Sequence, residues 1–62
     1  MQATIKNLLN GKEVRVTSTT NHPASSYGQP VWVDDGGNCY GQCKVMGEWH
    51  VDPGYQLQQV EQ

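Results

Sequence analysis

Polar and apolar residues alternate most regularly over residues 12–19, where Val14 and Val16 are flanked by charged or polar side chains. A period of two is typical of a half-buried β-strand, and β-branched residues favour that conformation. The Asn10-Gly11 pair just before this segment suits a tight turn, because both residue types tolerate positive φ. We therefore expect residues 3–9 and 12–19 to form a hairpin. Its predicted cross-strand partners are Ile5 with Val16 and Asn7 with Val14.

A short helix is the alternative interpretation of the N-terminus. Apolar residues fall there at helical spacing, followed by a glycine that could cap the helix: Met1, Ile5, Leu8, Leu9 and then Gly11. A helix this short, with no N-capping residue, is marginal in water, so the strand is favoured. Residues 56–62 carry the same ambiguity, since Leu57 and Val60 also fit one helical turn.

Turn-forming residues divide the rest of the chain at regular intervals. Residues 30–33 and 38–42 flank an Asp-Asp-Gly-Gly segment, which predicts a second hairpin with its turn at Asp35-Gly36. A last strand is expected to begin at Tyr55, after Asp52-Pro53-Gly54. The predicted partners in the second hairpin are Val33 with Asn38, Trp32 with Cys39, and Val31 with Tyr40.

Five short strands in 62 residues predict an all-β fold, either a small antiparallel five-stranded SH3-like barrel or a curled sheet. An α+β fold with a short N- or C-terminal helix is the alternative. Residues 1–62 are expected to form a single domain, because two domains would need about 50 residues each. The side chains expected to be mostly buried are Val14, Val16, Val31, Val33, Tyr40, Val45, Trp49 and Leu57.

The second hairpin carries apolar side chains on both faces, which leaves the position of Trp32 open. A bulge at Gly41 would turn the chain so that Trp32 lies outside, and an exposed tryptophan on a rigid strand is typical of an interface. Alternatively, Trp32 belongs to the core beneath the loop of residues 20–29, since large aromatic side chains are highly buried on average. In that case the loop becomes the better candidate for a binding site.

The formal net charge of −2 and the pI near 5.4 argue against a protein that binds polyanions, because phosphate contacts need clustered Lys and Arg. Lys6 and Arg15 would share one outward face of the first hairpin, so a weak single-stranded nucleic-acid-binding domain is the alternative function. No apolar run reaches the ~20 residues of a membrane span, and no basic-then-apolar leader follows Met1. We expect a cytoplasmic protein that makes no membrane contact.

Residues capable of catalysis or metal binding form no recognisable motif. Cys39 and Cys43 are spaced C-x3-C, about 13 Å apart on a continuous strand, which exceeds the reach of a disulfide. His22 and His50 complete a numerical Cys2His2 set, but the spacing of a zinc finger is missing. We therefore expect free thiols, no metal, no cofactor and no enzymatic activity.

The aromatic residues are all Tyr or Trp, a bias typical of protein-binding surfaces. We expect a non-catalytic binding module for another protein or a second copy of itself, of the inhibitor or adaptor type found among small phage and mobile-element proteins, although no motif assigns a family. The expected binding residues are Trp32, Tyr27, His22, Tyr40 and Trp49. Because so short a chain buries little apolar surface, we also expect a homodimer that covers the Trp32 face.

Overall fold

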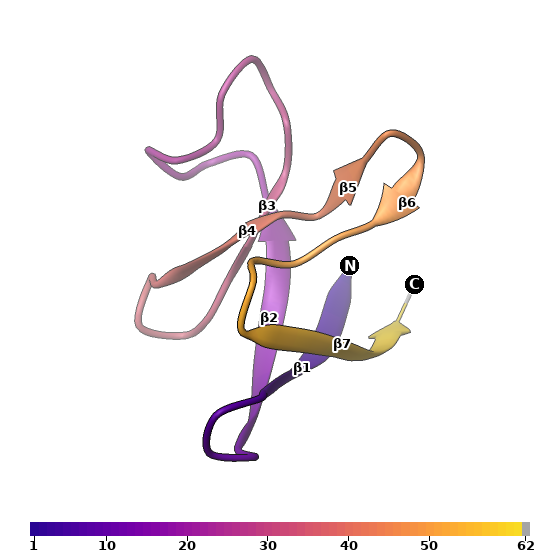
Figure 1. Ribbon diagram of the computed structural model, residues 1–62. Helices are drawn as coiled ribbons and strands as arrows, with labels where there is room; N and C mark the ends of the chain where they lie inside the picture. Colours follow the sequence, from indigo (N-terminus) through magenta and orange to yellow (C-terminus); the bar gives the residue numbers. More distant parts are fainter. Residues whose placement is uncertain (62) are drawn as a thin grey trace.

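The computed structural model describes residues 1–61, which form seven β-strands and no helix (Figure 1). The strands are β1 (Gln2–Asn7), β2 (Glu13–Thr19), β3 (Val31–Val33), β4 (Cys39–Gln42), β5 (Lys44–Val45), β6 (Glu48–Trp49) and β7 (Tyr55–Glu61). Five of them form one curled antiparallel sheet in the order β4-β3-β2-β1-β7, and β5 pairs with β6 in a separate hairpin. The all-β class predicted from the sequence is confirmed, as a half-barrel consistent with a small SH3-like barrel. Both segments with a helical alternative contain strands, β1 at the N-terminus and β7 at the C-terminus, and residue 62 of the second segment lies outside the described residues.

The β1–β2 hairpin has the predicted faces but a different register. Ile5 lies opposite Val14 and Ala3 opposite Val16, two residues away from the predicted pairing. The connection is longer than a two-residue turn, because the Asn7 side chain accepts a hydrogen bond from the backbone N–H of Leu9 at 2.8 Å and organises a wider loop. A shift of two residues keeps every side chain on its predicted face.

The β3–β4 hairpin is shifted by one residue and contains the predicted bulge. Val33 lies opposite Cys39 and Val31 opposite Gln42, so the single residue between them faces two residues of β4. Residues 35–37 form a three-residue loop, because the backbone N–H of Asp34 donates to Asn38 O at 3.1 Å. The predicted pairing was therefore wrong by one position at Val33 and, beyond the bulge, by two at Val31, whereas the turn at Asp35-Gly36 and the irregularity at Gly41 are confirmed.

The core lies against the concave side of the sheet. Its buried cluster consists of Ala3, Ile5, Val16, Trp32 and Cys43, whereas Val31 is also buried but is not part of this cluster. Around the cluster pack partly buried hydrophobic residues, namely Val14, Tyr40, Val51, Tyr55, Leu57 and Val60. Of the residues expected to be buried, Trp49 is the clear exception, because it is 37% exposed on the small β5–β6 hairpin. That hairpin is too small to bury both of its sides.

The chain between β6 and β7 runs along the outer edge of β4 and brings the two ends of the sheet together. The backbone N–H of Asp52 donates to Tyr40 O at 2.9 Å. Tyr40 packs edge-on against Tyr55, with ring centroids 5.1 Å apart. The curl of the sheet is thereby held without strand-to-strand pairing between β4 and β7. Among the described residues there is no helix that could cross a membrane.

Candidate binding surface

Trp32 is part of the core and offers no surface to a partner. Its side chain is 0% exposed, and its indole N–H donates to His50 O at 2.8 Å. The ring of Trp49 lies over it with a centroid separation of 6.3 Å. The bulge in β4 therefore does not leave Trp32 outside: of the two interpretations, the structure shows the one that places Trp32 in the core, and it leaves no exposed Trp32 surface for a partner or a dimer contact. The physical reason is that the β5–β6 hairpin, which carries Trp49, covers the Trp32 ring.

Trp49 connects this buried ring to the surface. Lys44 places its Nζ 4.8 Å from the centroid of the Trp49 ring, a cation–π arrangement. Trp32, Trp49 and Lys44 thus form a stack that leads from the core to solvent. Trp49 is the member of the stack that keeps partial access to a partner.

Tyr40 and Asp34 form a polar cluster next to the core. The Tyr40 hydroxyl donates to Asp34 Oδ2 at 2.7 Å, and Asp34 also accepts hydrogen bonds from Asn38 and from the backbone of Gly36. These bonds, the one from Tyr40 first, lower the pKa of Asp34 to about 2. The bond to Asp34 and burial raise the pKa of Tyr40 to about 12. Tyr40 therefore has a structural hydrogen bond that a partner would have to replace.

This cluster makes stability depend on pH in the acid range. The pKa of Asp34 falls from 3.8 to about 2 on folding, so its contribution is complete above about pH 4 and is lost as the pH falls toward 2. We expect the wild-type midpoint of urea unfolding to decrease over this range more than that of Asp34→Asn. The Tyr40→Phe variant, which removes one donor, should give an intermediate slope. Parallel decreases in wild type and Asp34→Asn would contradict this assignment.

His22 fixes the long loop to the β3–β4 turn. Its Nδ1 accepts a hydrogen bond from the backbone N–H of Ala24 at 3.0 Å, and its Nε2 lies 2.9 Å from Gly37 O. With Nδ1 as acceptor, Nε2 carries the proton and donates to that carbonyl. Both ring nitrogens are therefore used within the chain. The role of His22 is to hold the loop rather than to present a free imidazole.

Tyr27 and Met46 are the most unusual surface residues of the protein. Each is fully exposed and each has a positive φ, 53° at Tyr27 and 51° at Met46. Each precedes a glycine that also has positive φ, Gly28 or Gly47. The Tyr27 turn is closed by the Gln29 N–H, which donates to Ser26 O at 2.9 Å. Both turns therefore have two central residues in the left-handed region, where Asn-Gly or Gly-Gly is the usual pair.

The backbone conformation at these two positions is costly for the residues that occupy it. A left-handed conformation costs an ordinary L-residue about 1–2 kcal/mol, and Asn or Gly at the same place would avoid most of that cost. An exposed side chain returns little packing energy to offset it. Tyr27 was predicted as a binding residue, but Met46 was not. The signal that could have found it is the Met-Gly step in the middle of a hairpin, where Asn-Gly is expected.

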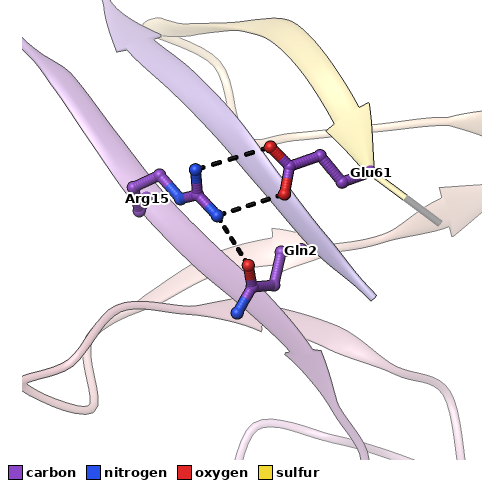
Figure 2. A network of polar contacts seen from close by, with 3 residues as sticks. All are labelled: Gln2, Arg15 and Glu61. Atoms are coloured by element: carbon purple, nitrogen blue, oxygen red, sulfur yellow. Dashed lines mark hydrogen bonds and ion pairs between the residues drawn. The ribbon is translucent and has the colours of Figure 1, made fainter.

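The basic residues do not gather as the predicted register implied. Lys6 lies opposite Glu13 rather than Arg15. Arg15 reaches across β1 and binds Glu61 of β7 at 3.1 Å, and it also donates to Gln2 Oε1 at 2.6 Å (Figure 2). Lys6 and Arg15 still lie on the same outward face of the hairpin, but Lys6 is opposite Glu13 and Arg15 is bound to Glu61, so this face carries two carboxylates beside its two positive charges.

Cys39 and Cys43 are free thiols in this structure. Burial raises the pKa of Cys43 to about 11, with a smaller contribution from Cys39, so Cys43 is protonated and a poor nucleophile at neutral pH. Within residues 1–61 no cluster of three or more His, Cys, Asp or Glu side chains could hold a metal ion. No pocket is found in the same part of the chain.

Comparisons with protein families, with curated proteins and with solved structures find no match for this chain. The functional argument therefore depends on the residues themselves. The candidate site that they define consists of Tyr27, Gly28, Met46 and Gly47, which we call the two-turn surface.

Proposed function

We propose that this protein is a non-catalytic binding module that contacts another protein through the two-turn surface. The observation that carries the proposal is the pair of large, fully exposed side chains held on strained tight turns, Tyr27 and Met46. Residues that adopt an unfavourable backbone conformation and gain no packing energy in return are concentrated at functional sites. Aromatic and methionine side chains are also enriched where proteins meet.

The arrangement of the two turns supports a shared role. The segment between β2 and β3 and the β5–β6 turn project at the same end of the molecule in Figure 1, opposite the β1–β2 turn. Two-residue turns restrict the backbone, so the cost of ordering the backbone at these two positions has already been met in the free protein. Free thiols fit action in a reducing cytoplasm, and a rigid domain of this size fits an inhibitor or adaptor, such as phages and mobile elements encode.

The first test is the cost of the strained turns. We expect Tyr27→Asn and Met46→Asn each to raise the free energy of unfolding by about 0.5–1 kcal/mol, because Asn tolerates positive φ. Urea or thermal unfolding would measure this change. Leu9→Asn is the matched control, since Leu9 is 95% exposed in a turn but is not among the positive-φ residues. It should leave stability unchanged, and equal effects for all three variants would contradict the strain argument.

The second test is binding. Immobilised wild type and Leu9→Asn should retain the same protein from a lysate of the cells that produce it. The double variant Tyr27→Asn/Met46→Asn should lose that protein although it is at least as stable. Nuclease treatment should leave the capture unchanged. Capture that survives the double substitution would overturn the assigned surface, and capture lost on nuclease treatment would favour the nucleic-acid alternative.

A further inference from the structure

The two edges of the five-stranded sheet differ in how they are protected. At the β4 edge, the segment after β6 lies alongside the strand, and Asp52 donates its backbone N–H to Tyr40 O at 2.9 Å. At the β7 edge, the outward backbone groups of residues 56–61 have no hydrogen-bond partner within the described part of the chain. One edge is covered, and the other is open to pairing.

The open edge also lacks most of the features that prevent strand addition. β7 spans seven residues, Tyr55–Glu61, with the sequence YQLQQVE. It contains no Pro and no Lys, and its one charged residue is at its C-terminal end. That residue, Glu61, is already bound by Arg15 from β2, which holds the end of the strand in place (Figure 2). The extra residue at Gln58, where the register with β1 shifts, is the one protective irregularity.

We propose that β7 is a self-association edge, at which a second copy of this chain adds its own β7 in antiparallel orientation. Two-fold pairing would place the two Glu61 side chains at opposite ends of the joined strands and the uncharged residues between them. No like charges would meet, and the hydrogen-bond ladder of one sheet would continue into the other. The apolar side of β7 carries Tyr55, Leu57 and Val60, which pack against the core. Pairing would extend this apolar side across the joint.

A homodimer of this kind replaces the one expected at Trp32, and it is independent of the two-turn surface. The turns project at the end of the molecule occupied by the β2–β3 segment and the β5–β6 hairpin, whereas β7 lies at the edge of the sheet (Figure 1). A dimer through β7 would therefore present two copies of the binding surface to a partner. Two linked copies would strengthen binding to a partner with repeated sites.

Sedimentation equilibrium from tens to hundreds of micromolar tests the proposal. The expected result is an apparent mass that rises with concentration toward twice the 6.9 kDa of one chain. Gln56→Lys/Gln59→Lys adds exposed charges along the edge and should weaken dimerisation by about tenfold or more, because like charges then face each other across the two-fold axis. Thr17→Lys is the matched control, since Thr17 is exposed on β2, which is paired on both sides.

Amide hydrogen exchange supplies a measurement that needs no variant. Outward N–H groups of residues 56–61 should become more protected as the wild-type concentration rises, while those of β4 should not change. A monomer at every concentration would overturn the proposal. A dimer that persists in Gln56→Lys/Gln59→Lys would also overturn it. If Tyr27→Asn/Met46→Asn breaks the dimer instead, self-association is assigned to the turns. Loss of partner capture with an intact dimer would count against the proposed function alone.

Discussion

Trp32→Ala is expected to leave the protein largely unfolded at room temperature. Trp32 is the largest fully buried side chain, and truncating a buried tryptophan costs about 3–5 kcal/mol. A domain of this size has only a few kcal/mol of stability, about 0.05–0.15 kcal/mol per residue. The substitution also removes the donor to His50 O and the ring on which Trp49 packs. Far-ultraviolet circular dichroism and the exchange rates of the β1 and β2 amides would measure the loss.

Two control variants separate the parts of this effect. Trp32→Phe keeps an aromatic ring but removes the indole N–H, so it should cost clearly less than alanine. Trp49→Ala truncates a tryptophan that is partly exposed and should cost about 1–2 kcal/mol. If the wild type is a dimer and the Trp32→Ala variant is a folded monomer, burial of Trp32 within one chain is contradicted. Trp32 would then be an interface residue.

The alternation of apolar and polar residues was enough to predict the strands and most of their faces. Val14 and Val16 face the core as their period of two requires, and both terminal segments are strands because β1 and β7 pair with each other. That pairing joins residues 48 to 59 positions apart, so no local pattern could settle the choice between strand and helix. Tertiary pairing decides such cases more often than local propensity does.

The registers could not be predicted, because side chains in the turns set the loop lengths. Asn7 accepts hydrogen bonds from the backbone N–H groups of Leu9 and Asn10 and widens the first loop. Asp34 accepts them from Gly36 and Asn38 and sets a three-residue second loop. Dipeptide preferences indicate where a turn is located but not how many residues the loop contains.

The candidate site was predicted only in part, for a related reason. Tyr27 belongs to the loop that becomes the better candidate if Trp32 is buried, but its strain depends on φ, which composition does not show. Met46 was missed because a lone methionine in a sequence is usually a core residue. The position of Trp32 depended on a two-stranded hairpin folding over it, and β5 and β6 have only two residues each.

Gly41→Ala is the second substitution for which we expect a large loss of stability, about 2–3 kcal/mol. Gly41 has φ +100°, and a Cβ added there would lie 2.9 Å from Asp52 Cγ, closer still to its Oδ1, and 3.1 Å from its backbone N. Backbone strain and steric overlap would therefore act together. Gly54→Ala is the matched control, since Gly54 has φ +91° and an added Cβ would meet nothing within 4 Å.

A double-mutant cycle isolates the steric part of that effect. If Asp52 obstructs the added methyl group, Gly41→Ala should cost about 1 kcal/mol less in an Asp52→Ala background than in wild type. Equal costs in the two backgrounds would show that the Asp52 side chain is not responsible, which leaves backbone strain and the contact with the Asp52 backbone N.

The same substitution bears on the β4 edge, because Asp52, which the added methyl group would displace, is the residue that donates to Tyr40 O. In Gly41→Ala the β4 edge should open as well, and chains with two open edges can associate into open-ended arrays rather than stopping at dimers. Light scattering that grows with time for Gly41→Ala but not for Gly54→Ala would show this, and identical scattering would mean that the β4 edge remains covered.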